Sequence, residues 1–317
     1  MRLIHQGLGN IGLGIARLAL ERGHTIVAAC DLDPAKAGRD LGTLLGTSPL
    51  GVEVTTDAEA ALRTPADILV HCTGSRLRTV LPQLEAAVQA GLDVASTCEE
   101  LAYPWYHHPA EARRLDEAAR RRGVTVVGLG VNPGFVMDAL PIMLTAPCRQ
   151  VTRISAERVV DVSTRREALQ RKVGVGLAPE AFQAGVRQGS LGHVGLGESA
   201  AMIAAALQWE VGRVSEEIAP VVNGGVVRGL HQVARAYRTG DGDEPAVVLD
   251  LVMAQGAADP HDAITIHGLP ELHLVIPGGI HGDLATWAIV TNALPVIKDA
   301  PPGLLPVYRL PLLHLVP

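Results

Sequence analysis

The sequence predicts an α/β protein: an N-terminal Rossmann domain with a doubly wound parallel sheet, followed by a second, α+β domain. Three observations carry this prediction. The first 130 or so residues alternate between short apolar runs and amphipathic segments, and a glycine-rich turn separates the first run from the first segment. After Gly134 the pattern changes to longer strand-like stretches.

The elements of the first part are placed by their hydrophobic periodicity. Strands are expected at 2–6, 25–30, about 52–55, 67–72, 92–97 and 124–129. Helices are expected at 11–22, 34–44, 57–62, 76–90 and 109–122. In the last of these helices Ala112, Leu115 and Ala119 form an apolar stripe between charged residues, which is typical of a helix with one solvated face.

The second part reads as strands at 151–160, 246–254, 262–267 and 272–276, with a helical region at 197–212 and an NGG turn at 223–225. A last apolar helix, about 283–297, precedes a proline-rich tail at 301–317, which we expect to lie against the first domain. We therefore expect a dinucleotide-binding domain at 1–133, joined by the C-terminal segment 280–317, and a second domain at 134–279.

The turn after the first strand reads GLGNIG and gives the spacing G-x-G-x-x-G. Gly7 permits the tight turn, Gly9 lets the backbone approach a pyrophosphate, and Gly12 lets the helix pack close to the strand. The pyrophosphate then lies at the helix N-terminus, where free N–H groups favour an anion. We expect NAD to bind here, through Gly7, Leu8, Gly9, Asn10, Ile11 and Gly12. The alternative is a glycine turn that binds nothing.

Asp31 ends the second predicted strand, where a carboxylate can accept hydrogen bonds from both hydroxyls of an adenosine ribose. The same carboxylate repels the 2′-phosphate of NADP, and Asp33 adds a second negative charge. Lys36 and Arg39, on the next predicted helix, are the nearest cationic side chains downstream. The sequence thus predicts a preference for NAD, with use of NADP left possible.

Polar residues follow the fourth, fifth and sixth predicted strands, in HCTGS, STCEE and VNPGFVMD. Ligands of doubly wound sheets lie beyond the carboxyl ends of the strands, so a cofactor bound at the first turn extends its nicotinamide towards these loops. Thr73 and Ser75 are placed to contact the cofactor or, alternatively, to cap the next helix, and Asn132 to bind the carboxamide. The candidate cofactor contacts here are Thr73, Gly74, Ser75, Asn132, Pro133 and Gly134.

The neighbouring residues Glu99 and Glu100 are the strongest catalytic candidates. Two carboxylates at the mouth of an apolar cleft raise the pKa of at least one of them by desolvation and mutual repulsion. A carboxyl group with a raised pKa suits general acid–base catalysis near neutral pH. The alternative is a solvated loop in which one of the two caps a helix.

The composition excludes several other classes of protein. A net charge of −6 without a basic stripe argues against a nucleic-acid partner. The most apolar stretch, 124–146, is interrupted by polar residues and prolines and does not read as a membrane span. The first strand begins at residue 2, which leaves no room for a signal peptide, and the four scattered cysteines indicate free thiols in the cytoplasm. His107 and His108 lack the spacing of a metal site, and we expect no metal.

Five motifs together carry a resemblance to a known family: GLGNIG, CTGS, STCEELAYPW, VNPGFVMD and TNALPVIKDAPPGL. They resemble the 2,4-diaminopentanoate dehydrogenases and the related native amine dehydrogenases, within the dihydrodipicolinate-reductase-like group. The resemblance implies a homodimer that uses NAD(P) to deaminate an amine oxidatively to a ketone and ammonia, or to run the reverse reductive amination. It also implies that a glutamate of STCEE is the catalytic acid–base, Glu99 first and Glu100 as the alternative. Asn292, in the last motif, joins the candidate cofactor contacts.

The second domain is expected to supply the substrate pocket and the dimer contact. Candidates for the pocket wall are Trp105, Tyr106, Phe135, Met137, His193 and Trp209, for which the alternative is ordinary core packing. If the substrate carries a carboxylate, it can be bound from the polar segment of Arg165, Arg166, Gln170 and Lys172, which equally suits plain surface charge.

Two classes of competing interpretation remain: a related oxidoreductase, similar to dihydrodipicolinate reductase or homoserine dehydrogenase, and a non-catalytic NAD-binding regulator. A dihydrodipicolinate reductase carries a histidine pair followed by a lysine and an S-G-T segment, which nothing here matches, and a homoserine-dehydrogenase-like enzyme needs a lysine where this chain has Glu99. A non-catalytic NAD-binding regulator does not need the acidic pair.

Overall fold

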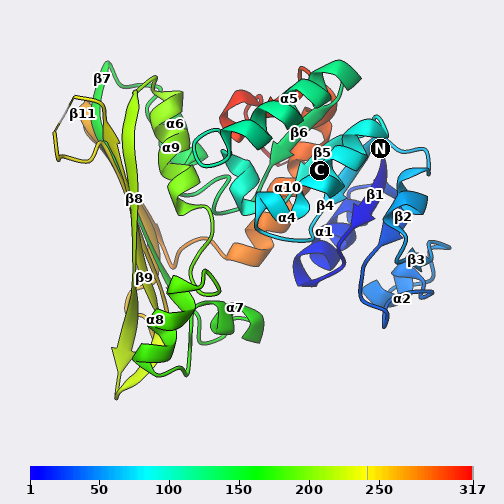
Figure 1. Cartoon of the computed structure of the whole chain (residues 1–317), viewed down its shortest axis with the longest axis horizontal. Coiled ribbons are helices and arrows are strands. Elements are labelled where there is room, and N and C mark those ends of the chain that lie inside the picture. Colours follow the sequence, from blue (N-terminus) through cyan, green and yellow to red (C-terminus); the bar gives the residue numbers. More distant parts are fainter. Residues whose placement is uncertain (241, 316–317) are drawn as a thin grey trace. The chain divides into compact units, whose positions relative to one another are not determined.

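The computed structural model describes residues 1–240 and 242–315. The chain forms two compact units, Met1–Gly134 together with the C-terminal segment from His281, and Phe135–Ile280 (Figure 1). The chain passes once into the second unit and returns once. The predicted fold class is confirmed, because the first unit holds a parallel sheet between helices and the second a mixed sheet with helices.

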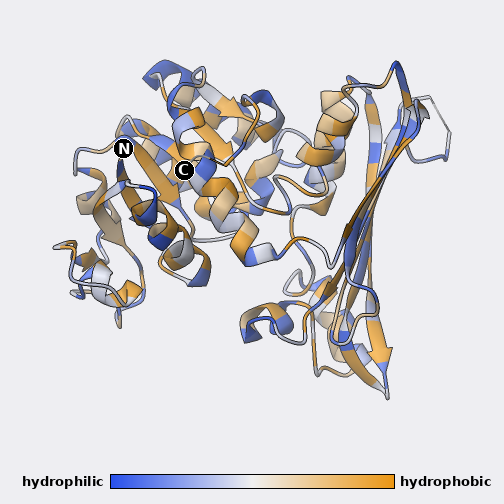
Figure 2. Cartoon of the chain, turned by 180° about the vertical axis from the view of Figure 1, so that it is seen from behind, coloured by the Kyte–Doolittle hydropathy of each residue, from blue (hydrophilic) through white to orange (hydrophobic). Residues whose placement is uncertain are grey.

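The first unit contains a seven-stranded sheet in the order β13-β6-β5-β4-β1-β2-β3, in which every neighbouring pair is parallel. Its strands are β1 (Arg2–Gln6), β2 (Thr25–Cys30), β3 (Val54–Thr55), β4 (Ile68–His71), β5 (Asp93–Ser96), β6 (Thr125–Gly128) and β13 (Gly303–Leu305). The strands are largely apolar (Figure 2), as expected for parallel strands covered on both faces. β13 adds the C-terminal segment to the sheet edge beside β6. The end of the predicted tail, 316–317, lies outside the described residues.

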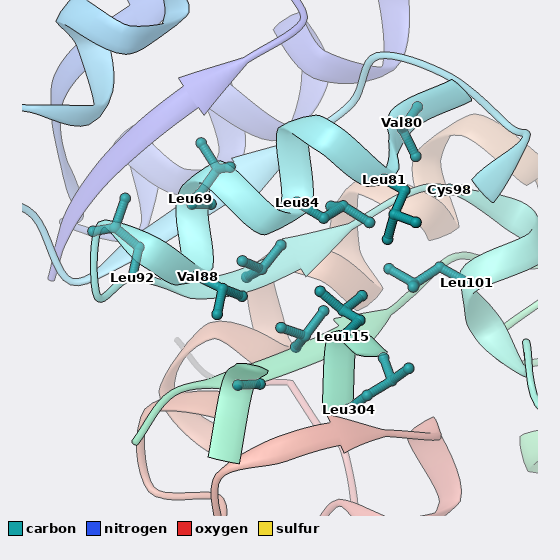
Figure 3. Close-up of a cluster of buried hydrophobic side chains, with 14 of the residues drawn as sticks. Leu69, Val80, Leu81, Leu84, Val88, Leu92, Cys98, Leu101, Leu115 and Leu304 are labelled. Carbon is teal, nitrogen blue, oxygen red and sulfur yellow. The ribbon is translucent and has the colours of Figure 1, made fainter. Parts of the chain in front are cut away.

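Helices cover this sheet on both faces. They are α1 (Asn10–Glu21), α2 (Leu41–Leu45), α3 (Ala58–Leu62), α4 (Leu77–Gln89), α5 (Pro109–Arg122) and α10 (Gly282–Lys298), with the 3₁₀ turns η1 (Glu99–Ala102) and η2 (Val307–Arg309). α4 and α5 pack together over Ile4, Leu69 and Val94 of the sheet, and their leucines fill that core (Figure 3). Burial of each such leucine contributes about 1.5–3 kcal/mol. α1 and α10 pack on each other, and α10 contacts β5 and β6.

The helix predicted at 34–44 is wrong in its first two-thirds. The backbone N–H of Ala35 donates to the Asp33 side chain, and Gly38 has φ +74°, so the chain turns here instead of continuing as a helix. Only α2 remains helical, beginning after Asp40, whose carboxylate caps it by accepting from the Thr43 N–H at 3.2 Å. Lys36 and Arg39 consequently lie in a turn after β2.

The second unit contains a six-stranded sheet in the order β12-β11-β7-β10-β9-β8, with β7 and β10 parallel and every other pair antiparallel. Its strands are β7 (Gln150–Asp161), β8 (Val211–Asn223), β9 (Val226–Arg238), β10 (Val247–Ala254), β11 (His261–Leu269) and β12 (Leu272–Pro277). Its helices are α6 (Ala139–Leu144), α7 (Glu167–Lys172), α8 (Pro179–Arg187) and α9 (Leu196–Ala206). α9 contacts β8, β9 and β10, and it is buried along most of its length.

The helix predicted at 197–212 ends early, because Gln208 has φ +58° and Val211 already begins β8. β8 and β9 were not predicted as strands. They form a long hairpin around Gly224 and Gly225, which have φ +62° and +75°. These are the angles of a two-residue hairpin turn, so the predicted NGG turn is confirmed. None of the helices in the described parts of the chain is long and apolar enough to cross a membrane.

Candidate active site

The three glycines of the first turn meet different constraints. Gly7 has φ +89°, and a Cβ there would lie 2.5 Å from the carbonyl oxygen of Cys72. A Cβ at Gly12 would lie 2.0 Å from the carbonyl oxygen of Gly7. Both positions therefore require glycine for the fold itself.

Gly9 is different, because a Cβ there would meet no atom within 4 Å. Gly9 precedes α1 as its N-cap, no side chain caps the helix, and its first turn holds no acidic residue. No side chain therefore caps the first N–H groups of α1, and an uncapped helix N-terminus of this kind suits an anion. The fold does not explain glycine at this position, whereas the close approach of a pyrophosphate does. The turn therefore fits a dinucleotide.

Asp31 lies at the end of β2 and is already tied to the turn. Its Oδ2 accepts from the Leu8 N–H at 2.6 Å and from Lys36 Nζ at 3.0 Å, and its Oδ1 accepts from the Asp33 N–H at 2.8 Å. Burial raises the pKa of this carboxyl, but these hydrogen bonds and the Lys36 charge outweigh burial and hold the pKa below its usual value. Asp31 is thus ionised, and a carboxylate retains acceptor sites beyond these three bonds.

Thr73 and Ser75 do not cap the helix that follows them. α4 begins at Leu77, and its N-cap residue Arg76 gives no side-chain cap. The Thr73 hydroxyl instead lies 2.8 Å from His71 Nε2 and donates to Gln83 Oε1 at 2.7 Å. The backbone carbonyl of Ser75 accepts from the Glu100 N–H at 3.2 Å and from the Cys98 thiol at 3.3 Å. The loops after β4 and β5 are therefore bonded to each other.

Glu100 performs the capping that Thr73 and Ser75 do not. Its carboxylate is buried, and Oε2 accepts from the Leu77 N–H at 2.7 Å. Oε1 accepts from Arg76 Nη1 at 2.8 Å. His108 Nε2, at the N-terminus of α5, lies 3.1 Å from Oε2. Glu100 thus joins the starts of α4 and α5 to η1, which is a structural role.

Glu99 stands beside it, half-buried, as the first residue of η1 directly beyond the end of β5. The preceding loop is anchored from below, because Ser96 Oγ accepts from the Cys98 N–H at 3.1 Å and the Thr97 N–H donates to the His71 carbonyl at 2.9 Å. The two glutamates therefore differ in their surroundings. The Glu100 carboxylate accepts from Leu77 and Arg76 and lies beside His108, whereas Glu99 follows a loop that is held by hydrogen bonds.

The other predicted cofactor contacts lie on elements of the same unit. Asn132 is half-buried in the loop after β6, which is held where the Val131 N–H donates to Thr286 Oγ1 of α10 at 3.2 Å. Gly134 has φ +122°, and a Cβ there would lie 2.6 Å from the Gly130 nitrogen. Asn292 is half-buried on α10.

Trp105 packs beside the core of the first unit and forms a tilted ring contact with Tyr103. It lines a cavity of about 520 Å³ along the edge strand β13, together with Tyr103, Tyr308, Arg120 and Arg309. β13 is two strands away from β5, which carries Glu99 at its end. Tyr106 forms an edge-on contact with the ring of His107.

The predicted pocket residues of the second unit lie on different elements. Met137 is buried and Phe135 half-buried before α6, while His193 is half-buried before α9. Gln170 donates to the Arg165 carbonyl at 2.8 Å, so this part of the polar segment is used locally at α7. The Trp209 ring lies beneath the Arg238 guanidinium, 4.8 Å from it.

Sequence reasoning missed the residues that hold His193. The buried Gln232 of β9 accepts from the His193 N–H at 2.8 Å and donates to its carbonyl at 2.9 Å. Glu216 of β8 accepts from Gln232 and from the Gly197 N–H at the start of α9. These residues fix the backbone of the GHVGLG segment. Gln232 and Glu216 lie on β9 and β8, the two strands that were not predicted from the sequence, so nothing in the sequence pointed to them.

Comparison with known proteins gives consistent results. A family model described as the 2,4-diaminopentanoate dehydrogenase C-terminal domain matches residues 135–316. The 2,4-diaminopentanoate dehydrogenase of Acetoanaerobium sticklandii is 31% identical over 98% of this chain and 93% of its own length. The amine dehydrogenase of Streptomyces virginiae is 30% identical over 66% of this chain and 60% of its own length.

A solved structure agrees with these sequence matches. The amine dehydrogenase of Mycobacterium smegmatis superposes with a TM-score of 0.88, at 25% identity, over 100% of this chain and 97% of its own. The resemblance seen in the motifs is therefore matched at the level of the whole fold.

Proposed function

Because the chain belongs to the 2,4-diaminopentanoate dehydrogenase family, we propose that it is an NAD(P)-dependent amine dehydrogenase. It oxidises a primary amine or diamino acid to a ketone and ammonia, and it runs the reverse reductive amination. The observation that carries the proposal is that one sheet of the first unit presents both a turn for the cofactor and a glutamate for the chemistry. An anion-accepting turn lies at the end of β1, and a glutamate lies at the end of β5 of the same sheet.

The first unit holds the cofactor in this proposal. Gly9 and the N-terminus of α1 receive the pyrophosphate, Asp31 the adenosine ribose, and Thr73, Ser75 and Asn132 the nicotinamide half. Support comes from the Gly9 position, which is open although glycine is not required there by the protein. The nicotinamide, when bound, accepts a hydride from the carbon that bears the amine.

Glu99 is the proposed acid–base. It takes up and returns protons at the substrate nitrogen and at water, and its charge favours the positively charged imine that precedes hydrolysis. Glu100 is the weaker candidate, because its carboxylate already accepts from Leu77 and Arg76 and lies beside His108. A base whose lone pairs are committed to these donors is poorly placed to accept another proton.

NAD is the preferred cofactor in this proposal. The ionised Asp31 repels a 2′-phosphate, and Lys36, the nearest cation, is paired with it at 3.0 Å and with Asp33 at 3.5 Å. A single charge repulsion of this kind gives about ten- to a hundredfold in specificity. We expect kcat/KM to favour NAD in the parent and to shift towards NADP in Asp31→Ala. Equal use of both cofactors by the parent contradicts this assignment.

The second unit supplies the substrate pocket and the dimer contact in this proposal. His193 and Phe135 are its pocket candidates, and His193 is held by Gln232. The sheet is covered by helices that contact β8, β9, β10 and β11, and Val159, Val248 and Val252 lie half-buried among residues of its opposite face. A second copy seated on this face makes the homodimer, and a size-exclusion comparison with Val252→Lys tests it.

A cytoplasmic location completes the proposal. The four cysteines are free, and burial raises the pKa of Cys30, Cys72 and Cys98 to about 12, which makes their thiols poor nucleophiles. Unreactive free thiols are the state expected in a reducing compartment.

The test is a turnover assay in alkaline buffer that follows the absorbance of the reduced cofactor. A panel of amines, diamino acids and the matching alcohols is offered with NAD and with NADP. We expect turnover of amines, release of ammonia and reductive amination of the product ketone. Turnover of alcohols alone supports a homoserine-dehydrogenase-like enzyme. Cofactor binding without turnover of any compound supports a regulator.

A further inference from the structure

A chain of buried hydrogen bonds runs across the strand ends of the first unit. The ring of His71, at the end of β4, is fully buried. Its Nδ1 lies 2.9 Å from Ser96 Oγ at the end of β5. Its Nε2 lies 2.8 Å from Thr73 Oγ1 and 3.0 Å from Gln83 Oε1. The proposed roles of the glycine-rich turn, the acidic pair and the substrate pocket make no use of these contacts.

The partners fix which nitrogen carries the hydrogen. Gln83 Oε1 receives Gln6 Nε2 at 3.3 Å as well as the Thr73 hydroxyl, so it is an acceptor, and His71 Nε2 must donate. Nδ1 is then bare and accepts the Ser96 hydroxyl, which itself accepts from the Cys98 N–H at 3.1 Å. Each group therefore donates to the next one along the chain: Cys98 to Ser96, Ser96 to His71, His71 to Thr73, and Thr73 to Gln83.

The His71 ring is uncharged at neutral and alkaline pH. Burial lowers the pKa of His71 to about 4, against the opposing hydrogen bond with Gln83. A neutral imidazole donates through one nitrogen and accepts through the other, and this is the pairing that the chain needs. A charged ring would present two donors and would reverse the Ser96 bond.

The chain includes residues from the loops that form both halves of the proposed site. At one end, Cys98 and Ser96 belong to the loop that leads into Glu99. Towards the other end, Thr73 belongs to the loop after β4, which packs so closely on Gly7 that a Cβ there would lie 3.1 Å from the Thr73 methyl group. The His71 ring is thus hydrogen-bonded to the loop that leads into Glu99 and to the loop that packs against the glycine-rich turn.

We propose that His71 is a positioning residue that fixes the Glu99 loop through Ser96 and the cofactor loop through Thr73 by means of one buried, uncharged ring. This inference rests on the proposed function for the identity of Glu99 and of the cofactor. The ring touches neither substrate nor cofactor itself.

Two conservative variants cut the chain on opposite sides. The amide group of Asn lies as many bonds from Cα as Nδ1 does, and that of Gln as many as Nε2. His71→Asn therefore keeps the bond to Ser96 and loses those to Thr73 and Gln83, whereas His71→Gln does the reverse. We expect His71→Gln to lower kcat about tenfold or more at unchanged affinity for NAD, and His71→Asn to weaken NAD binding about tenfold with a smaller change in kcat at saturation.

Cofactor affinity is measured without turnover, by calorimetric titration of the full chain with NAD alone. If both variants lose kcat and affinity together, in proportion to their loss of melting temperature, the role is merely structural and the proposal is overturned. If neither variant folds, Ser96→Ala and Gln83→Leu replace them: Ser96→Ala should lower kcat, and Gln83→Leu should weaken NAD binding. Gln89→Leu, at the exposed end of α4, is the control and should change neither quantity.

The outcome separates this inference from the proposed function. If Glu99→Gln keeps its rate, the acid–base assignment fails, but the His71 variants are still read by the split between NAD affinity and turnover. If Glu99→Gln is inactive and the split is absent, only the positioning role fails.

Discussion

At the scale of single residues, neighbouring and chemically identical side chains differ by what surrounds them. Glu99 and Glu100 are adjacent in sequence, yet Glu100 is buried against two helix starts and Glu99 begins η1 half-buried. The three glycines of the turn differ in the same way, since two have no room for a Cβ and one has ample room. Residue type thus identifies candidates, and local packing assigns their roles.

The acidic pair makes a direct test possible. We expect Glu99→Gln to lower turnover by about 10²–10⁴, the usual contribution of general acid–base catalysis, with cofactor affinity nearly unchanged. Glu100→Gln is the matched control, and it should lose thermal stability because an amide replaces the charge beside Arg76 and His108. Steady-state rates and cofactor titrations measure both. A Glu99→Gln enzyme at the parent rate, with an inactive but folded Glu100→Gln, transfers the role to Glu100.

The glycines give a second pair. Gly9→Val should leave the fold intact, because nothing lies within 4 Å of its Cβ, and should weaken cofactor binding strongly because the side chain occupies the space of the pyrophosphate. Gly12→Ala, a smaller change, should instead destabilise the protein, since its Cβ would lie 2.0 Å from the Gly7 carbonyl oxygen. Melting curves with and without NAD distinguish the two effects. A folded Gly9→Val with parent affinity would falsify the fingerprint assignment.

At the scale of elements, the sequence predicts strongly periodic segments well and turn-rich ones poorly. α5 begins and ends where its apolar stripe and Gly123 place it, because a single amphipathic face decides its packing. The helix expected at 34–44 fails because Asp33, Gly38 and Asp40 provide local turn and cap bonds that compete with the helix. β8 and β9 were missed because neither shows the strict alternation of buried and exposed residues that identifies a strand: no residue of β8 is fully buried, and β9 is buried on both faces.

The candidate site follows the same division. The turn, Asp31 and the glutamates were found because each motif is local and carries its own chemistry. The hydrogen-bond chain through His71 and the hydrogen bonds from Gln232 to the His193 backbone were not found, because they join residues that are far apart in sequence. Such pairings depend on strand order, which a single sequence does not reveal.

A strand-level prediction concerns β1, whose His5 is fully buried. In the described parts of the chain neither ring nitrogen has a hydrogen-bond partner, and burial lowers the pKa of His5 from 6.5 to about 4. The unfolded chain therefore binds a proton in the range between these values that the folded chain does not. Stability is fully retained above the ordinary pKa and is lost as pH falls towards the folded one.

The free energy of unfolding of the parent falls as the pH is lowered from about 7 to about 5. We expect this fall to be smaller by roughly 2 kcal/mol in His5→Leu, because leucine fills similar space without a titratable ring. Urea unfolding at the two pH values measures this difference. His24→Leu, at a less buried ring whose pKa is lowered mainly by desolvation and then by the N-terminal charge, is the control and should change the pH dependence less. An unchanged pH dependence in His5→Leu contradicts the argument.

At the scale of the whole molecule, the first unit depends on a segment that returns from the second. α10 and β13 belong to the first unit, but the chain reaches them only after leaving the second unit at Ile280. That exit is anchored within the second unit by a buried ion pair. Arg158 Nη1 donates to Asp262 Oδ1 at 2.8 Å, and Arg158 Nη2 donates to the Ile280 carbonyl at 2.6 Å. Asp262 Oδ2 accepts from the Ile280 N–H at 2.7 Å.

We expect Asp262→Ala to destabilise the second unit by about 3–5 kcal/mol, since it leaves the buried Arg158 guanidinium without its counter-charge and frees the Ile280 N–H. The double variant Arg158→Met/Asp262→Leu removes both charges and should recover most of this loss, because an apolar pair avoids the desolvation of two ions. Urea unfolding followed by far-UV circular dichroism, with limited proteolysis near residue 280, measures both. If the single variant is as stable as the parent, or the double variant no better than the single, the ion pair does not hold this exit.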